Sequence, residues 1–252
     1  MDLGLKGLKV ILTGGSRGIG RRALEIFAEE GCDVAFFSRG AEQVAEAKAA
    51  FEKYGVKVVG STFDLNDFDG YETWLKNAAE ELGGCDIFIP GASASGSQVT
   101  GDWDKCFQFD LMGAVKGCEA LEPYLEKSEH GSVVFMGSTA GVETFLVPQA
   151  YNTIKGSLLI YAKQLGQSWG AKGIRVNTVS PGPIEFSGGN WEGMKASMPE
   201  LYDAQINQFA LGRIGDPEDV AKTMVFIASP ASRYTTGTNV IVDGGYTKRV
   251  QF

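Results

Sequence analysis

The sequence predicts an α/β protein: a single doubly wound parallel sheet of the Rossmann type, flanked by helices on both faces. Short apolar runs of buried-strand character alternate with segments of helical periodicity almost to the end of the 252 residues. No Pro-rich linker or change of composition divides the chain, so we expect one domain over residues 1–252. Right-handed crossovers between parallel strands then place helices on both faces.

The strands are expected where apolar, β-branched and aromatic residues cluster. In chain order these runs are 9–12, 33–37, 56–63, 86–89, 132–136, 174–179 and 239–242. Between them, apolar residues at helical spacing predict the helices. In chain order these are 18–30, 41–54, 67–82, 102–127, 150–169 and 218–228.

The first strand leads directly into a glycine-rich turn, Thr13-Gly14-Gly15-Ser16-Arg17-Gly18-Ile19-Gly20, and then into a helix. Glycines let the backbone approach a pyrophosphate, and a helix N-terminus supplies free N–H groups and positive charge. An ordinary strand-to-helix turn would use the same residues. The turn therefore predicts a dinucleotide site only in combination with other evidence.

Residues from about 183 to 208 interrupt the alternation, and Gly188, Gly189 and Gly193 punctuate them. A long segment after the carboxyl end of a strand is where an α/β protein places a lid. The alternative is an ordinary excursion packed on the body. Large apolar side chains in or near this segment suggest an apolar or cyclic substrate, contacted by Phe145, Phe186 and Trp191. Met194 and Met198 are further lid candidates.

The composition excludes several classes of function. A net charge of −8 argues against a nucleic-acid partner held by phosphate contacts. The N-terminal residues lack the pattern of a signal peptide, and no apolar run is long enough to span a membrane. Four scattered cysteines without a CxxC pair suggest reduced thiols and a cytoplasmic protein. His130 is the only histidine, so no multi-histidine metal site is expected.

Tyr151 and Lys155 lie four residues apart, with Ser138 thirteen residues upstream of Tyr151. On a helix, positions i and i+4 share one face, so the phenol and the ammonium can converge. A nearby cation favours the phenolate, which suits Tyr151 to proton exchange with a carbonyl oxygen or an alcohol. This pattern indicates carbonyl–alcohol redox chemistry.

Six motifs in order resemble the short-chain dehydrogenase/reductase family, from Thr13 to Gly245. They are Thr13-Gly14-x-x-x-Gly18-x-Gly20, Asp64-Leu65, Gly137-Ser138-Thr139-Ala140-Gly141, Tyr151-x-x-x-Lys155, Arg175-Val176-Asn177-x-Val179-x-Pro181-Gly182 and Asp243-Gly244-Gly245. The resemblance implies that Ser138 binds the substrate oxygen and that Tyr151 is the general acid/base. Lys155 would tune Tyr151 and hold the nicotinamide ribose.

The charge after the second strand indicates NADP(H) rather than NAD(H). Ser38-Arg39 stands where an NAD enzyme has an acidic residue, and Arg17 adds a second cation. An Arg can pair with a 2′-phosphate, whereas a carboxylate would repel it. The expected cofactor contacts are Gly14, Ser16, Arg17, Gly18, Ile19, Gly20, Ser38, Arg39, Asp64, Leu65, Gly91, Ala92, Tyr151, Lys155, Pro181, Gly182 and Ile184.

The chain departs from the family pattern at three places. Pro90-Gly91-Ala92-Ser93 replaces the usual Asn-Asn-Ala-Gly, so the support of that segment must differ. Asp110 stands where the family has an accessory catalytic Asn, and its carboxylate could bind water or pair directly with Lys155. Phe186 lies near the position of a Thr that contacts the carboxamide, and it cannot donate a hydroxyl bond.

We therefore expect an NADP(H)-dependent oxidoreductase that interconverts a ketone and a secondary alcohol, with a small molecule as its substrate. A 3-oxoacyl reductase and a cofactor-binding regulator with little turnover are the alternatives. The strong acidity makes an acidic acyl carrier a less natural partner. By resemblance we also expect a homotetramer formed through two helices and the C-terminal region. Residues 225–227 and the tail ending at 250–252 are compatible with that assembly.

Overall fold

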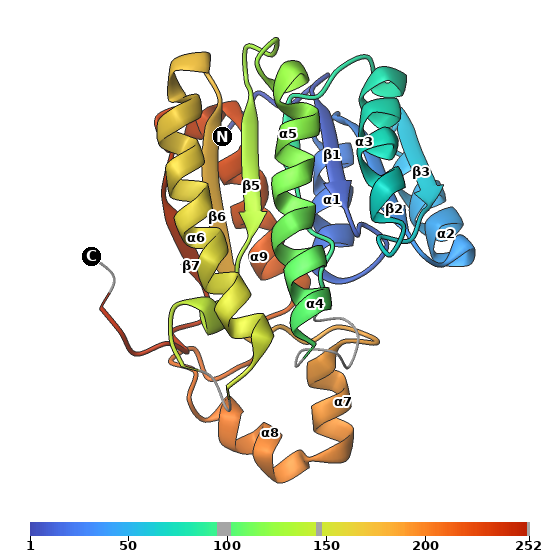
Figure 1. Cartoon of the computed structure of the whole chain (residues 1–252). Helices are drawn as coiled ribbons and strands as arrows, with labels where there is room; N and C mark the ends of the chain where they lie inside the picture. Colours follow the sequence, from blue (N-terminus) through green and yellow to red (C-terminus); the bar gives the residue numbers. More distant parts are fainter. Residues whose placement is uncertain (95–101, 145–147, 251–252) are drawn as a thin grey trace.

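A computed structural model describes residues 1–94, 102–144 and 148–250 of the chain. In these ranges, seven strands form one parallel sheet in the order β3-β2-β1-β4-β5-β6-β7, with helices on both sides (Figure 1). This confirms the predicted fold class. The strands are β1 Lys9–Thr13, β2 Asp33–Ser38, β3 Val58–Thr62, β4 Ile87–Ile89, β5 Ser132–Met136, β6 Arg175–Pro181 and β7 Asn239–Val242.

In the part of the chain that the structure describes, three helices cover each face of the sheet. Helices α1, α2 and α9 pack on one face, and α3, α5 and α6 pack on the other. Helices α7 and α8 lie beyond the carboxyl ends of the strands (Figure 1). The helices are α1 Gly18–Glu29, α2 Ala41–Glu52, α3 Phe68–Leu82, α4 Trp103–Cys106, α5 Gly113–Leu125, α6 Ala150–Trp169, α7 Asn190–Ser197, α8 Pro199–Ile206 and α9 Pro217–Ala228.

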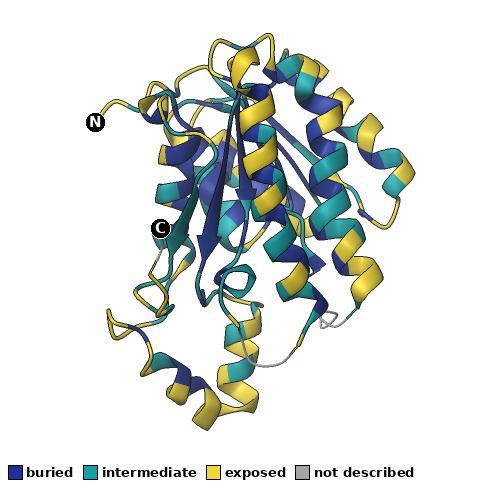
Figure 2. Ribbon diagram, turned by 60° about the vertical axis from the view of Figure 1, so that its left-hand side comes forward, coloured by how far each residue is buried: buried dark blue, intermediate teal, exposed yellow. Residues whose placement is uncertain are grey.

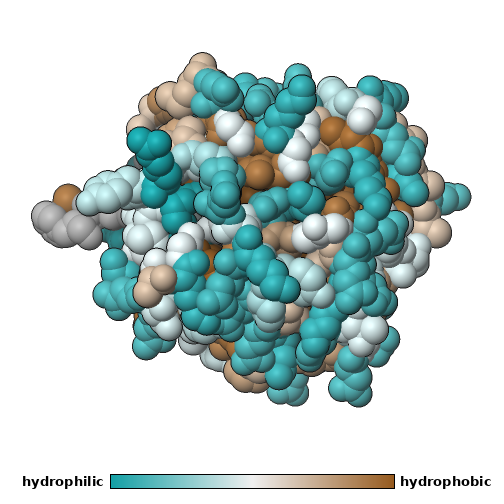
Figure 3. All heavy atoms as spheres, turned by 90° about the horizontal axis from the view of Figure 1, so that it is seen from above, coloured by the Kyte–Doolittle hydropathy of each residue, from teal (hydrophilic) through white to brown (hydrophobic). Residues whose placement is uncertain are grey.

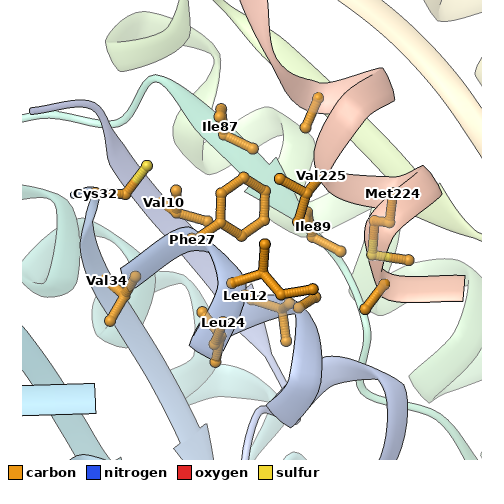
Figure 4. Close-up of a cluster of buried hydrophobic side chains, with 14 of the residues drawn as sticks. Val10, Leu12, Leu24, Phe27, Cys32, Val34, Ile87, Ile89, Met224 and Val225 are labelled. Atoms are coloured by element: carbon orange, nitrogen blue, oxygen red, sulfur yellow. The ribbon is translucent and has the colours of Figure 1, made fainter. Parts of the chain in front are cut away.

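Alternate residues of the strands supply the two halves of the core. Val10 and Leu12 of β1 face Phe27 of α1 and Val225 of α9 (Figure 4). Ile11 between them joins the opposite cluster under α3 and α5. The central strands are accordingly buried and the edge strand β7 is partly buried, while exposed residues lie on the outer faces of the helices and in loops (Figure 2).

The end of the molecule at the amino ends of the strands is covered mainly by hydrophilic side chains, with smaller apolar areas between them (Figure 3). Among the helices in the described ranges, none combines the length and the apolar character that a membrane span requires.

The predicted helix over residues 102–127 is present but is not a regular α-helix throughout. It consists of α4, a π-helix over Phe107–Met112 and α5. The widened turn contains Asp110, whose side chain is held by residues outside the helix. An insertion of this kind is typical of functional sites. Periodicity indicated a helix here but not its interruption.

The glycine-punctuated stretch after β6 contains two helices that the sequence did not predict. Helix α7 has no buried residue and contains Gly193, so its apolar periodicity is weak. Helix α8 begins with Pro199 in its first turn, a position that proline tolerates.

Arg175 joins the sheet to the C-terminus of α9. Its guanidinium donates to the carbonyl oxygens of Ile227 (2.8 Å), Ala228 (2.7 Å) and Ser229 (3.0 Å). Burial lowers the pKa of Arg175 to about 10, which leaves it charged at neutral pH. The cation therefore satisfies carbonyl groups that the helix leaves unpaired and complements its dipole.

We expect Arg175→Met to lower the free energy of unfolding by about 2–4 kcal/mol, because several carbonyl groups lose a charged donor. Urea unfolding at pH 7 measures the effect. The free energy of unfolding of Arg175→Lys should lie between those of the native protein and Arg175→Met, since one ammonium cannot reach all of these carbonyl oxygens. A loss below about 0.5 kcal/mol for Arg175→Met would show that water replaces the guanidinium at no cost.

Candidate active site

One cavity of about 480 Å³ lies at the carboxyl ends of the strands, between the sheet and helix α7. Every predicted cofactor contact lines it, although these residues come from positions 14 to 184 of the chain. Ser138, Phe186 and Trp191 line it as well. The carboxyl ends of parallel strands meet at one edge, which is why segments so distant in sequence converge here.

The glycine-rich turn forms one wall of the cavity. Gly14 has φ +80° and Gly18 has φ +58°, in the left-handed region that side chains disfavour. A Cβ at Gly14 would lie 3.1 Å from Cα of Ala92, and one at Gly18 would lie 3.0 Å from the ring of Phe186. The N-cap Arg17 does not cap helix α1 with its side chain, and the first turn contains no acidic residue. The space and the free N–H groups fit a phosphate group.

Thr13 holds the segment Pro90-Gly91-Ala92-Ser93, which lacks the two asparagines of the family pattern. Its Oγ1 accepts hydrogen bonds from the backbone N–H groups of Gly91 (3.0 Å) and Ala92 (3.1 Å). A buried hydroxyl at the end of β1 thus holds the segment after β4 against the glycine-rich turn. The sequence predicted that the support would differ, but not that Thr13 would provide it.

In the middle of the turn, Ser16 donates to Oγ of Ser38 (2.8 Å), which links the turn to the end of β2. Arg39 follows Ser38 and is exposed at the cavity. Within the described ranges, no hydrogen bond or ion pair engages its guanidinium. Arg17 also lines the cavity, but its Nη1 donates to the carbonyl oxygen of Gly188 (3.1 Å).

Tyr151 and Lys155 lie on one face of α6, as their spacing predicted. Lys155 Nζ is 5.5 Å from the centre of the Tyr151 ring and donates to the carbonyl oxygen of Met136 (2.8 Å). Ser138 follows β5, and its Oγ accepts from the N–H of Ala140 (3.2 Å). All three side chains face the same cavity. A backbone carbonyl such as that of Met136 leaves no signal in the sequence.

Asp110 pairs directly with Lys155, which decides between the two partners that the sequence left open. The distance from Lys155 Nζ to Asp110 Oδ1 is 3.0 Å. The Lys155 side chain is 3% exposed and the Asp110 side chain 0%. Burial by itself would lower the pKa of Lys155, but the charge of Asp110 opposes it, and the net result is a raised pKa. The ammonium therefore stays charged throughout the neutral range. Asp110 itself does not line the cavity but lies behind Lys155.

The segment after β6 closes the cavity at one end, where Trp191 and Met194 of α7 line it. Phe186 packs against Gly18 and Gly189, beside the glycine-rich turn. Met198 lies outside the cavity and is 48% exposed. Phe145 falls outside the described residues.

The same segment is tied to its own base. Glu185 accepts hydrogen bonds from the Tyr202 hydroxyl and from Lys195 Nζ (3.1 Å). The hydrogen bond from Tyr202, with that from Lys195, lowers the pKa of Glu185 despite its partial burial. Helices α7 and α8 are thereby fixed to the strand end that precedes them.

In the part of the chain that the structure describes, no group of three or more His, Cys, Asp or Glu side chains is placed to hold a metal ion. The cysteines Cys32, Cys85, Cys106 and Cys118 are buried.

Comparisons with known proteins cover all or nearly all of the chain. A family model described as Enoyl-(Acyl carrier protein) reductase matches residues 14–247. The chain is 37% identical to an isoepoxydon dehydrogenase of Penicillium expansum, over 100% of this chain and 99% of that protein. It is 34% identical to an NADP-dependent mannitol dehydrogenase of Hypocrea jecorina, over 97% and 94%. The structure of L-sorbose reductase from Gluconobacter frateurii with NADPH and L-sorbose superposes with a TM-score of 0.89 at 25% identity, covering 99% and 100%.

Proposed function

We propose that this chain, which belongs to the short-chain dehydrogenase/reductase family of alcohol and ketone oxidoreductases, uses NADP(H) and Tyr151 to interconvert a ketone and a secondary alcohol. One observation carries the proposal. Tyr151, Lys155 and Ser138 converge in the cavity whose other wall is the glycine-rich turn.

The residues of the cavity fit a dinucleotide. The space at Gly14 and Gly18 and the N-terminus of α1 would receive the pyrophosphate, and Lys155 would hold the nicotinamide ribose. When bound, the nicotinamide supplies or accepts the hydride.

The protein's own residues handle the proton and the substrate oxygen. In the reducing direction, the Tyr151 hydroxyl gives its proton to the carbonyl oxygen as negative charge develops there. The Ser138 hydroxyl donates a hydrogen bond to the same oxygen and fixes its position. The Lys155 ammonium stabilises the phenolate that remains. In the oxidising direction, the same groups act in reverse.

The names of relatives support a small hydroxylated substrate and NADP(H). They include an NADP-dependent mannitol dehydrogenase and an L-sorbose reductase that was solved with NADPH and L-sorbose. In this chain, the cavity combines the amide side chains of Gln149 and Asn190 with the apolar Trp191 and Met194. Such a lining suits a carbonyl compound with hydroxyl groups on a short chain or ring.

Oxidation of NADPH over a panel of carbonyl compounds tests the function. The panel contains ketoses, hydroxylated cyclic ketones, simple cyclic ketones and 3-oxoacyl thioesters. Turnover of the first two groups supports the proposal, and preferential turnover of thioesters supports the 3-oxoacyl reductase. Tight NADPH binding without turnover of any compound would instead indicate a regulator.

Arg39 is proposed to select NADP(H) through the 2′-phosphate. We expect Arg39→Gln to raise the KM for NADPH about 10- to 100-fold, because a charge-assisted hydrogen bond is lost. The KM for NADH should change by less than about twofold, since that cofactor has no 2′-phosphate. Steady-state kinetics with both cofactors measures the difference.

Arg21→Gln is the matched control for Arg39. Arg21 is an arginine of α1 that pairs with Glu46 (2.9 Å) and does not line the cavity. Its replacement should leave both KM values unchanged. A native kcat/KM ratio for NADPH over NADH at or below unity would overturn the cofactor assignment.

A cytoplasmic homotetramer remains part of the proposal. Of the apolar residues expected at a subunit contact, Val225 and Ile227 are buried in the core, whereas Phe226 is 38% exposed. Phe226 is thus available for a partner, as is Val250 of the C-terminal tail, which is 71% exposed. Analytical ultracentrifugation of the native protein and of Phe226→Asp tests the assembly.

A further inference from the structure

Two positions where the sequence departs from the family pattern meet in the structure. The Ser93 hydroxyl donates a hydrogen bond to Oδ1 of Asp110, and the backbone N–H of Ala94 donates to Oδ2 (3.0 Å). Lys155 Nζ lies 3.0 Å from the same Oδ1. Asp110 is therefore a buried carboxylate whose oxygens are held from three directions. A buried charge requires such partners, because water cannot reach it.

The contacts of Lys155 limit how its ammonium can act. Of its three N–H groups, one is directed to Asp110 and one to the carbonyl oxygen of Met136. One N–H remains for a ligand in the cavity that Lys155 lines. The direction of this N–H depends on where the carboxylate of Asp110 lies.

We propose that Ser93 is a positioning residue: its hydroxyl fixes the carboxylate of Asp110, and through it the Lys155 ammonium, beside Tyr151 and the cofactor. The inference rests on the proposed function, because it concerns the same site.

The Ser93 hydroxyl is not needed to hold the backbone of its own segment. The segment from Gly91 to Ala94 is already held by the two hydrogen bonds to Thr13 and by the bond from Ala94 to Asp110. Removal of the Ser93 hydroxyl leaves these backbone bonds in place. The change removes the hydrogen bond from Ser93 to Oδ1 of Asp110 and leaves Lys155 as the partner of that oxygen. The carboxylate can then rotate, and the Lys155 ammonium can move together with it.

A double-mutant cycle with Ser93→Ala, Asp110→Asn and the double variant tests the inference. We expect Ser93→Ala to weaken NADPH binding about fivefold and to lower kcat about tenfold, because a hydrogen bond to a charged group is lost. In the Asp110→Asn background, the same change should have less than about a twofold effect, since the two residues act as one unit. NADPH fluorescence titration gives the binding constants, and carbonyl reduction between pH 6 and 10 gives kcat.

The pH profile distinguishes positioning from stability. The titratable groups that act on Asp110 are Lys155 on α6 and Cys106 on α4. Tyr151 in turn acts on Lys155, and Asp102 acts on Cys106. Burial and then the charge of Asp110 raise the pKa of Cys106 to about 11, so its thiol stays neutral over most of the range. We expect Ser93→Ala to move the midpoint of the kcat profile by about half a pH unit or more. Ser93→Thr, which keeps a hydroxyl, should restore it.

Ser128→Ala is the matched control. The Ser128 hydroxyl also donates to a carboxylate, that of Asp86, but at the amino ends of the strands. Its loss should leave NADPH binding, kcat and the pH profile unchanged. Equal effects of Ser93→Ala in the native and Asp110→Asn backgrounds would overturn the inference. A lowered melting temperature with an unchanged pH profile would also overturn it.

The failure of this inference can be told from the failure of the proposed function. If the native protein binds NADPH but reduces no carbonyl, the proposed function fails, and the binding cycle still decides the role of Ser93. If the native protein does not bind NADPH, both are wrong.

Discussion

Replacing Tyr151 by Phe should lower kcat for carbonyl reduction about 10²- to 10⁴-fold, the usual contribution of a positioned general acid. The change removes one hydroxyl and keeps the ring that lies 5.5 Å from Lys155 Nζ. Ser138 and the glycine-rich turn are untouched, so NADPH should still bind within about threefold of the native affinity. Stopped-flow or steady-state kinetics gives kcat, and fluorescence titration gives the affinity.

Tyr161→Phe is the matched control, because Tyr161 lies on the same helix and loses the same hydroxyl. Its ring packs edge-on against Phe135, with the ring centres 5.7 Å apart, and it does not line the cavity. Its replacement should leave kcat unchanged. If Tyr151→Phe retained more than about a tenth of the native kcat, another group would have to supply the proton.

The sheet could be predicted closely from the sequence, because each strand is a separate apolar run between polar turns. The expected strand at 33–37 corresponds to β2 Asp33–Ser38, and that at 132–136 corresponds to β5 with the same bounds. Parallel strands buried on both faces leave this continuous apolar signal. The alternation with helices then fixed the direction of the strands.

The elements that were missed depend on contacts rather than on periodicity. The π-helix at Phe107–Met112 has the polarity of an ordinary helix, and it contains Asp110, whose side chain is bonded to residues outside the helix. Helices α7 and α8 bury little of their surface, so no apolar stripe identifies them. Local pattern indicates burial well, but it carries little information about a partly exposed segment.

The residues of the candidate site could be predicted from the sequence, but the contacts between them could not. Motif spacing brought Ser138, Tyr151 and Lys155 together, since Ser138 follows β5 and the other two lie in the first turns of α6, at the same edge of the sheet. The partner of Asp110 stayed open, because a carboxylate can bind water or an ammonium equally well by type. Only the positions of Ser93, Ala94 and Lys155 around it show which partner is present.

The buried pair of Asp110 and Lys155 makes a prediction about stability. We expect Asp110→Leu to lower the free energy of unfolding by about 3–5 kcal/mol at pH 7, because Lys155 remains buried without its counter-charge. Urea unfolding measures the change. Glu46→Leu is the control, since it breaks the exposed pair with Arg21 and should cost less than about 1 kcal/mol.

The effect of pH on this loss identifies its cause. In the native protein the pKa of Lys155 is raised. The contribution of the charged Lys155 to stability is therefore fully present below its unfolded-state pKa of about 10.4. This contribution is lost only as the pH rises through the higher folded-state pKa. In Asp110→Leu, burial without the carboxylate should lower the folded-state pKa of Lys155, so the variant regains stability as the pH rises.

The difference between native protein and Asp110→Leu should consequently narrow by about 1 kcal/mol or more between pH 7 and pH 10. Unfolding curves at the two pH values, with Glu46→Leu measured alongside, give the comparison. A difference that stays constant with pH would mean that lost packing, rather than an unpaired ammonium, destabilises the variant. In that case Asp110 would fill space behind the site without setting the charge state of Lys155.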